Sequence, residues 1–288
     1  MGQRYQGWIG GKRRCSPQAH LYGMKHSHPV LAARMALELT GIDFQAHDVL
    51  PGLHGIVVRA NGFAGWTVPA LRLDGRRIQG TLAIARELHR VEPEAGLFPS
   101  DPGRRRVVEQ AERFGHDELQ PLARRAFRWA GIRDNAVREW MARYVVGVPA
   151  PALAGYAFKP VMILYGRYIS KASDAQVRQD LARLPGLLDH VDALIDEGAI
   201  GGAAPNAADL QILTSVRLLL AHDDLRPAIA GRPCGQAALR LIPDYPRSGP
   251  DALPPIPAVL PLEWLPARYP RRDPRPAIAA PTEAKQPA

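Results

Sequence analysis

Apolar residues change between strand-like and helix-like spacing along the first ninety positions. Short apolar runs predict strands over residues 20–24 and 42–49. Between them, apolar residues recur at three- and four-residue spacing over 29–41, which predicts an amphipathic helix. A strand, a helix and a strand in this order favour a parallel pair joined by a crossover. Similar reasoning predicts a short helix over 53–60 and a helix over 81–91.

One apolar run in this region, residues 67–71, is interrupted by Pro69. Asp74-Gly75 follows it, and Asp-Gly between two strand-like runs predicts a hairpin, because both turn residues need positive φ. Proline cannot donate a hydrogen bond to a sheet. The local sequence is compatible with a trans proline opening an edge strand or with a cis Val68–Pro69 bond. A cis turn would leave the backbone of Val68 open to a molecule outside the chain.

Helical spacing dominates the second half of the chain, where Pro121 predicts a break in the first helix and Pro185 a bend or break in the fourth. From residue 243, proline becomes frequent and the helical period disappears. This composition predicts an extended or disordered tail. The predicted helices of the second half cover residues 104–130, 134–146, 159–170, 174–197 and 206–222. The candidate residues that would anchor the tail on the helical domain are Leu260, Leu262, Trp264 and Leu265.

These patterns divide the chain into five parts. An α/β domain with the order β-α-β-(α)-β-β-α is followed by a turn-rich linker and an all-helical domain. The five parts are a flexible basic arm (1–18), the α/β domain (19–92), the linker (93–103), the helical domain (104–242) and the proline-rich tail (243–288).

Composition narrows the class of protein. The 288 residues carry a formal charge of +9, but the basic residues are scattered and no aromatic stripe accompanies them, so we expect no specific nucleic-acid partner. Two distant cysteines, Cys15 and Cys234, allow neither a disulfide framework nor a CxxC motif, which favours a reducing compartment. The N-terminus lacks the apolar region of a signal peptide, and no apolar run approaches the length of a membrane span. We therefore expect a cytoplasmic protein without a membrane partner.

Several short motifs resemble the cytosolic glutathione S-transferase family, in matching order and spacing. Residues 21–23, 27–29 and 34–41 resemble its first strand, active-site loop and first helix, and 67–71 resemble its cis-proline segment. Residues 81–84 resemble its "Ser-x-Ala-Ile" helix start, 97–99 its linker, and 205–212 a helix start in its second domain. The resemblance covers about residues 20 to 225. It implies a thioredoxin-like N-terminal domain followed by an all-helical domain, and it favours a cis Pro69.

The last of these motifs also has a physical basis. Asn206 is a good N-cap residue, and Asp209 stands three positions later. An acidic side chain there can reach back to the N–H of the cap residue. A capping box is therefore predicted at the start of this helix.

The resemblance implies that the thiolate of glutathione, the co-substrate, attacks an electrophile. A free thiol has a pKa near 8.5, which a hydroxyl donor and a helix N-terminus can lower. Ser27 is the candidate catalytic residue, although a simple N-cap role would also explain a serine there. Tyr22 lies within a predicted strand, where core packing is expected. His26 and His28 alone do not make a metal site, so His28 is taken as a substrate-adjacent donor and no metal is expected.

The resemblance also assigns the binding residues. The backbone of Val68, held by Pro69, would pair with the cysteinyl part of glutathione, and Thr81 would hold the γ-glutamyl carboxylate at a helix N-terminus. Gly80 stands where the family has an acidic residue or glutamine, so Gln79 is the candidate replacement, and another low-molecular-weight thiol is conceivable. Candidate residues of the electrophile pocket between the domains are Phe114, Glu118, Arg124 and Trp129.

The sequence therefore predicts a glutathione S-transferase-like enzyme that conjugates a thiol to a small electrophile, with a homodimer as a possible assembly. Thiol-dependent peroxidase or isomerase chemistry at the same site stays open. A non-catalytic member of the fold that binds ligands or other proteins is the alternative from a different class.

Overall fold

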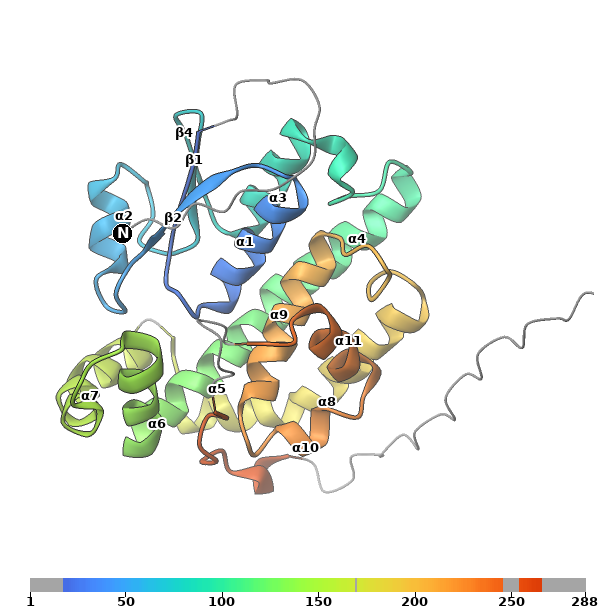
Figure 1. Ribbon diagram of the computed structural model, residues 1–288. Helices are drawn as coiled ribbons and strands as arrows, with labels where there is room; N and C mark the ends of the chain where they lie inside the picture. The colour runs from blue at the N-terminus through green and yellow to red at the C-terminus, as the bar shows by residue number, and fades with distance from the viewer. Residues whose placement is uncertain (1–17, 169, 246–253, 266–288) are drawn as a thin grey trace, which may run out of the picture.

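A computed structural model describes residues 18–168, 170–245 and 254–265. The predicted arm, except Gln18, and most of the predicted tail lie outside these residues. A small α/β domain sits on a larger helical domain (Figure 1). The α/β domain consists of β1 (Ala19–Gly23), α1 (His28–Leu39), β2 (Phe44–Asp48), α2 (His54–Ala60), β3 (Ala70–Leu73), β4 (Arg76–Gln79) and α3 (Thr81–Val91).

The four strands form one sheet in the order β2-β1-β3-β4. β1 pairs with β2 in parallel, as predicted, and β3 runs antiparallel to both β1 and β4. Neighbouring residues of a strand point to opposite faces. Leu21 and Leu71 accordingly join the core beneath α1 and α3, whereas Tyr22 and Ala70 pack on the α2 side. Tyr22 is thus a core residue, as expected.

The hairpin between β3 and β4 has the predicted two-residue turn. Asp74 and Gly75 have φ of 48° and 81°, the positive values that a turn of type I′ requires. The Val68–Pro69 peptide bond is cis. The hairpin turn predicted from the local sequence is confirmed, and so is the cis bond that the family resemblance favoured.

The first helices of the second domain follow a short 3-10 turn, η1 (Pro93–Ala95). A kink or break was expected near Pro121 in the helix predicted over 104–130. The helix continues through this region but contains a π-helical segment that ends at Leu119, so the irregularity is a change of helix type rather than a break. The helices of this domain are α4 (Pro102–Phe114), η2 (Gly115–Leu119), α5 (Gln120–Arg133), α6 (Asn135–Trp140), η3 (Met141–Val146), α7 (Pro151–Tyr168), α8 (Asp174–Asp196), α9 (Ala207–Ala221), α10 (Arg226–Ile229) and α11 (Pro233–Leu241).

Three helix predictions need correction. α7 begins at Pro151 rather than at residue 159, and Pro160 lies inside it. The Arg138 guanidinium donates a 3.0 Å hydrogen bond to the carbonyl of Gly155, which ties α7 to α6 in spite of the proline. Pro185 does not divide α8. The short helices α10 and α11 were not predicted.

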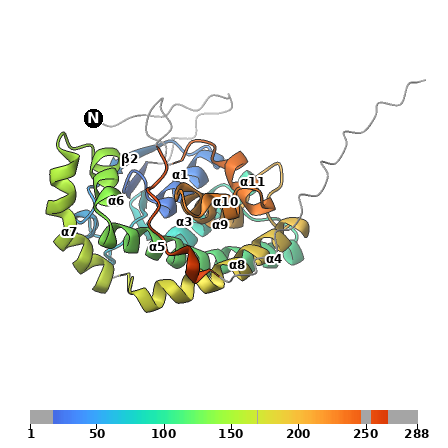
Figure 2. The ribbon, with the colours of Figure 1, turned by 90° about the horizontal axis from the view of Figure 1, so that it is seen from below.

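Helix α9 is the centre of the helical domain. Every one of its residues is buried, and it contacts α1 as well as α4, α5 and α11 (Figures 1 and 2). The predicted capping box is confirmed: the side chain of Asn206 accepts a 3.2 Å hydrogen bond from the N–H of Asp209, whose carboxylate accepts a 2.9 Å bond from the N–H of Asn206. This helix therefore holds the two domains together.

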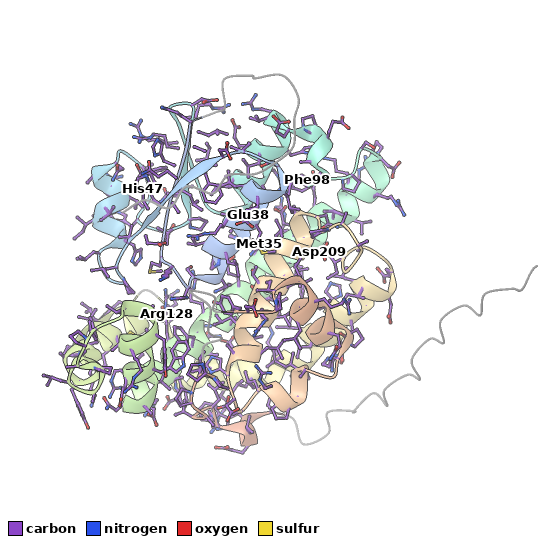
Figure 3. The ribbon with its side chains drawn as sticks, in the orientation of Figure 1. Met35, Glu38, His47, Phe98, Arg128 and Asp209 are labelled. Atoms are coloured by element: carbon purple, nitrogen blue, oxygen red, sulfur yellow. The ribbon has the colours of Figure 1, made fainter. Side chains whose placement is uncertain are left out.

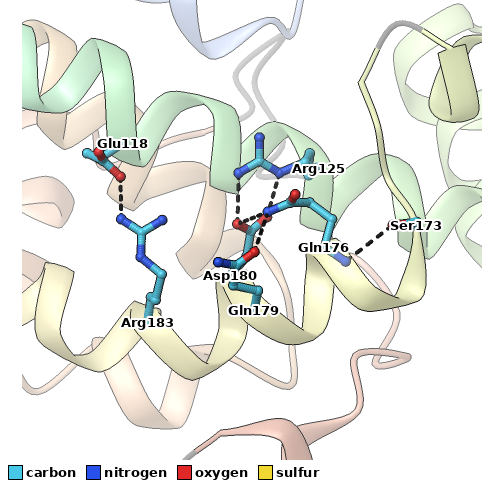
Figure 4. A network of polar contacts seen from close by, with 7 residues as sticks. All are labelled: Glu118, Arg125, Ser173, Gln176, Gln179, Asp180 and Arg183. Atoms are coloured by element: carbon cyan, nitrogen blue, oxygen red, sulfur yellow. Dashed lines mark hydrogen bonds and ion pairs between the residues drawn. The ribbon is translucent and has the colours of Figure 1, made fainter.

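Polar contacts join α5 to α8 (Figure 4). Arg125 donates two hydrogen bonds, of 2.5 and 2.8 Å, to the buried carboxylate of Asp180. Gln176 adds a 3.2 Å bond to the same carboxylate, and Arg183 pairs with Glu118 at 2.5 Å. The side chain of Arg125 is thus part of the structural frame of the domain.

The described parts of the predicted tail are residues 243–245 and 254–265, and the latter, which includes the 3-10 turn η4 (Leu262–Trp264), lies on the helical domain. Ile256 forms a β-bridge with His222. Leu260 is buried, and the ring of Trp264 packs against Trp129 at 5.7 Å between centroids. Of the candidate anchors, Leu262 is 44% exposed and does not serve as one.

Among the described residues, no single helix is long and apolar enough to cross a membrane. Taken together, 135–146 and 151–164 reach the required length and composition, but they are bent by 103°. Leu153, Tyr156 and Leu164 of α7 expose more than half of their surface. α7 therefore has one exposed apolar side and one side that faces the cavity described next.

Candidate active site

A cavity of about 180 Å³ opens between the two domains. The first domain supplies the loop after β1, the start of α2 and the segment before Pro69, and the second supplies α5, α6, η3 and α7. Figure 3 shows Arg128 where the first domain meets the α6–α7 pair. The lining residues on which the function depends are Ser27, His28, Val68, Arg124, Phe127 and Arg128.

Ser27 is the N-cap residue of α1, a helix of 12 residues. Its side chain makes no capping hydrogen bond, so the simple capping role does not account for the serine. The backbone of Ser27 closes the loop instead, because its N–H donates to the carbonyl of Met24 at 3.0 Å. Ser27 lines the cavity at the positive end of the helix dipole, where a donor can stabilise an anion.

The loop that carries Ser27 is held by a residue from the far end of the chain. The hydroxyl of Tyr245 donates a 2.8 Å hydrogen bond to the backbone carbonyl of His26. Tyr245 also lines the cavity. Burial lowers the pKa of His26 to about 4, with a further lowering from Lys25. No short-range sequence signal points to Tyr245, because the contact spans 219 positions.

Val68 lines the cavity, and its backbone hydrogen-bonds to none of the described residues. Pro69 is buried behind it, with its carbonyl accepting a 2.9 Å bond from the N–H of Gly80. The structure thus brings Ser27, His28 and Val68 to one cavity, as the sequence predicts, whereas Pro69 supports the cavity from behind.

The side chain of Gln79 is occupied within the chain. Its Oε1 accepts a 2.8 Å hydrogen bond from the N–H of Gly65, and its Nε2 donates a 2.6 Å bond to the carbonyl of Thr67. A Cβ at position 65 would lie 2.6 Å from this Oε1, so only glycine permits the contact. Gln79 therefore supports the segment that precedes Val68.

Thr81 lies away from the main cavity. Its hydroxyl is buried without a hydrogen-bond partner and lines a second, much smaller cavity of about 10 Å³, together with Glu112 and Gln211. Gly80, the N-cap residue of α3, has φ of 91° and ψ of 150°, a combination that is essentially restricted to glycine. The departure of Gly80 from the family pattern therefore has a conformational basis.

His28 is buried, and its ring hydrogen-bonds to the backbone of Gln120. Burial lowers the pKa of His28 to about 3, and the positive charges of Arg124 and Arg128 lower it further. The imidazole is consequently neutral and cannot act as an acid at physiological pH. Within the described ranges, no three His, Cys, Asp or Glu side chains are placed to hold a metal ion.

Of the four residues suggested for the electrophile pocket, only Arg124 lines the cavity. Phe114 packs against His190 at 4.5 Å between ring centroids, and Trp129 donates a 2.8 Å hydrogen bond to Asp174. Glu118 pairs with Arg183 on α8, as described above. The sequence reasoning missed Phe127 and Arg128, although both share a helical face with Arg124.

The sequence was compared with known families and proteins. Residues 21–96 match the family model of the glutathione S-transferase N-terminal domain. This part of the chain is therefore similar to the N-terminal domain of glutathione S-transferases. No curated protein matches the sequence at a significant level.

Solved glutathione S-transferases share the fold of both domains. Glutathione transferase F2 from Populus trichocarpa is 16% identical, with a TM-score of 0.51 over 79% of this chain and 94% of its own. A beta-etherase from Sphingobium is 16% identical, with a TM-score of 0.51 over 77% and 99%. Glutathione S-transferase-I with bound lactoylglutathione is 15% identical, with a TM-score of 0.51 over 79% and 95%. The glutathione S-transferase fold predicted for the chain is confirmed.

Proposed function

We propose that the protein is a glutathione S-transferase-like enzyme that conjugates glutathione, or a related low-molecular-weight thiol, to an electrophilic small molecule. The observation that carries this proposal is Ser27, which lines the interdomain cavity and whose side chain does not cap its own helix. Donation from this hydroxyl to the bound sulfur would favour the thiolate over the thiol.

In the proposed reaction the thiol loses its proton to solvent, and the Ser27 hydroxyl stabilises the resulting thiolate. The sulfur attacks the electrophilic carbon, a C–S bond forms, and the leaving group departs with the bonding electron pair. Burial lowers the pKa of His28 to about 3, so the proposed reaction does not use this histidine as the base. The bound lactoylglutathione of one structural relative supports a glutathione-type ligand here.

We place the cysteinyl part of the thiol along the backbone of Val68. The γ-glutamyl carboxylate would meet the backbone N–H groups at the start of α3, because the side chain of Gln79 is bound to the segment before Val68 and the buried hydroxyl of Thr81 lines the second cavity. This arrangement makes fewer side-chain contacts than the family pattern implies. A non-catalytic protein that binds ligands is therefore the second candidate, and homodimer formation and a cytoplasmic location remain predictions.

Retention on immobilised glutathione, followed by conjugation to 1-chloro-2,4-dinitrobenzene, tests the proposal. We expect Ser27→Ala to lower kcat/KM by about 10- to 100-fold, since a hydrogen bond to a charged group contributes about 1.5–3 kcal/mol. Ser173→Ala is the matched control, because Ser173 caps α8 through its side chain away from the cavity. Unchanged turnover in Ser27→Ala would contradict the catalytic role, and retention without turnover would favour the ligand-binding protein.

A further inference from the structure

The outer side of α7 is apolar, which is unusual for a helix side that is exposed to water. Its large side chains there expose between 62% and 72% of their surface, and they are Leu153, Tyr156, Leu164 and Tyr168. Because successive residues turn by about 100° around a helix, these positions fall on one side of it. Lys159 is the only charged residue of α7 whose side chain is described, and it flanks this side next to Tyr156. An exposed apolar patch of this kind marks an interaction surface.

A second group of exposed apolar side chains lies beside this helix, on the first domain. Its members, each more than half exposed, are Leu50, Leu53, Ile56 and Trp66. They surround the start of α2, where a Cβ at position 55 would lie 3.0 Å from the ring of Trp66. The loop before α2 meets α7, because a Cβ at position 52 would lie 3.9 Å from Val161, which is itself 48% exposed. α2 and α7 accordingly lie on one side of the molecule (Figure 1), and we call the two groups together with Val161 the apolar face.

The chain around the apolar face is positively charged. The two stretches that carry the face, residues 49–73 and 140–173, contain Arg and Lys but no Asp or Glu. Three of the carboxylates that flank these stretches each pair with an arginine, namely those of Asp48, Glu139 and Asp174. The fourth, Asp74, lies in the hairpin turn, at the end of β3 away from Val68 and the cavity. The flanking acidic residues therefore do not neutralise the surroundings of the face.

Three basic side chains lie at the edge of the apolar face. Lys159 and Lys171 are exposed, and neither pairs with a carboxylate of the described residues. The guanidinium of Arg59 lies 5.6 Å from the ring centroid of Trp66. It donates to two backbone carbonyls, at 3.2 and 2.6 Å, rather than to a carboxylate. The apolar face thus has a positive rim.

An apolar face with a positive rim fits the surface of an anionic lipid bilayer. Aliphatic side chains enter the boundary of the acyl chains, while tyrosine and tryptophan favour the level of the head groups. Basic side chains at the rim attract anionic head groups and lay their apolar stems along the membrane. A second copy of the chain fits less well, because it would bring the same positive rim against itself, and like charges repel. The charge around the face therefore favours lipid.

Docking on a membrane surface does not require a membrane span. The sequence predicts no membrane partner because no apolar run is long enough to cross a bilayer. A helix that lies in the plane of the membrane needs only one apolar side, which α7 has. The bend of 103° between residues 135–146 and 151–164 also fits a helix pair that lies along a surface rather than across it.

We propose that the apolar face docks the protein on the surface of an anionic lipid bilayer, with α7 in the plane of the membrane. Leu153 and Leu164 enter the acyl-chain boundary, and Lys159 and Lys171 bind the head groups. This inference goes beyond the proposed transferase function and needs neither a thiol nor turnover. Val161 belongs to both the apolar face and the cavity wall, so docking brings the cavity next to the bilayer.

Flotation of the full chain with lipid vesicles tests the inference. The vesicles contain phosphatidylcholine alone or phosphatidylcholine with about 30% phosphatidylglycerol. We expect binding to the anionic vesicles, and a loss of binding when the salt concentration rises from about 0.05 M to about 0.5 M, because salt screens the charge of the head groups. Residues 1–17 and 266–288 also contain basic residues, so variants of the apolar face, rather than flotation alone, decide the result.

Two double variants separate the apolar from the charged contribution. Leu153→Ser/Leu164→Ser should lower the partition coefficient by about tenfold or more, since two large apolar side chains lose their contact with the acyl chains. Lys159→Gln/Lys171→Gln should lower it by about 10- to 30-fold on anionic vesicles. The matched controls, exposed on α4 and α11 away from α7 (Figure 1), are Val107→Ser and Arg106→Gln/Arg240→Gln.

Loss of flotation in both double variants, with flotation of both controls, would support the inference. Flotation that persists in Leu153→Ser/Leu164→Ser would overturn it, and so would equal binding to vesicles without phosphatidylglycerol. Absence of flotation for the intact protein would overturn it as well. If Leu153→Ser/Leu164→Ser then converts a dimer to a monomer in size-exclusion chromatography, a second copy covers the face.

The Tm of each variant should equal that of the intact protein, because the substituted side chains are exposed. If the leucine variant fails to fold, the lysine variant and its control still decide the result. Failure of conjugation would leave vesicle binding unchanged, and failure of vesicle binding would leave the transferase proposal unchanged. The two proposals are therefore tested separately.

Discussion

The hydroxyl of Tyr245 lies 2.8 Å from the carbonyl oxygen of His26, the residue immediately before Ser27. Tyr245 is buried, and burial raises the pKa of its phenol well above the ordinary value. The phenol therefore stays protonated and keeps donating. The C-terminal part of the helical domain thus holds the loop that presents Ser27.

We expect Tyr245→Phe to lower the free energy of unfolding by about 1–3 kcal/mol, because the carbonyl of His26 is left without its donor. The looser loop should also reduce kcat more than it raises the KM for the electrophile. Urea unfolding and steady-state kinetics measure both effects. Tyr156→Phe, on the exposed side of α7, is the control. Turnover and stability equal to those of the intact protein would show that the contact does not position the loop.

The contacts of Gln79 predict an effect on thiol binding. Gln79→Ala removes both hydrogen bonds to the segment before Val68. We expect the KM for glutathione to rise by about 2- to 10-fold with little change in kcat, since each neutral hydrogen bond contributes about 0.5–1.5 kcal/mol. In Gln79→Glu the carboxylate still accepts from the N–H of Gly65 but cannot donate to the carbonyl of Thr67. Its KM for glutathione should therefore lie between those of the intact protein and Gln79→Ala.

Gln45→Ala, on the exposed part of β2, is the matched control for this series. An unchanged KM in Gln79→Ala would mean that the segment before Val68 does not set the position of the thiol.

His222 predicts a loss of stability in acid. Both of its ring nitrogens are buried without a hydrogen-bond partner among the described residues, and burial lowers its pKa to about 4. Between the unfolded pKa of about 6.5 and this value, the unfolded chain binds one proton more, so stability falls as the pH falls. The contribution is up to about 3 kcal/mol, because one pKa unit corresponds to about 1.4 kcal/mol.

We therefore expect His222→Leu to reduce the decline in unfolding free energy between pH 6.5 and pH 4, as measured by chemical denaturation. His26 and His28, whose pKa values burial also lowers, should leave part of the decline in place. His190→Leu is the control, because His190 is exposed on α8. If the unfolding free energy of His222→Leu fell as steeply with pH as that of the intact protein, His222 would not be a cause of the loss of stability in acid.

Local interactions made much of the fold predictable. Asp74-Gly75 specifies its turn because both residues accept positive φ. Asn206 and Asp209, three positions apart, specify the start of a helix by capping it. The rule that proline ends or breaks a helix failed in α7. Pro160 removes one backbone donor, but tertiary contacts such as that of Arg138 with Gly155 hold the helix.

The candidate site was predictable only in part. The sequence alone determined the order of elements, the hairpin turn and the place of Ser27 at the start of a helix, since these depend on residues a few positions apart. The cis state of Pro69 followed only from the family resemblance. Only the tertiary structure decided which side chains meet at the cavity. Arg124 and Arg125 are adjacent in sequence, yet one faces the cavity and the other a buried carboxylate. Their directions follow from how α5 packs against α8 and the first domain, and such packing depends on residues far apart in the chain.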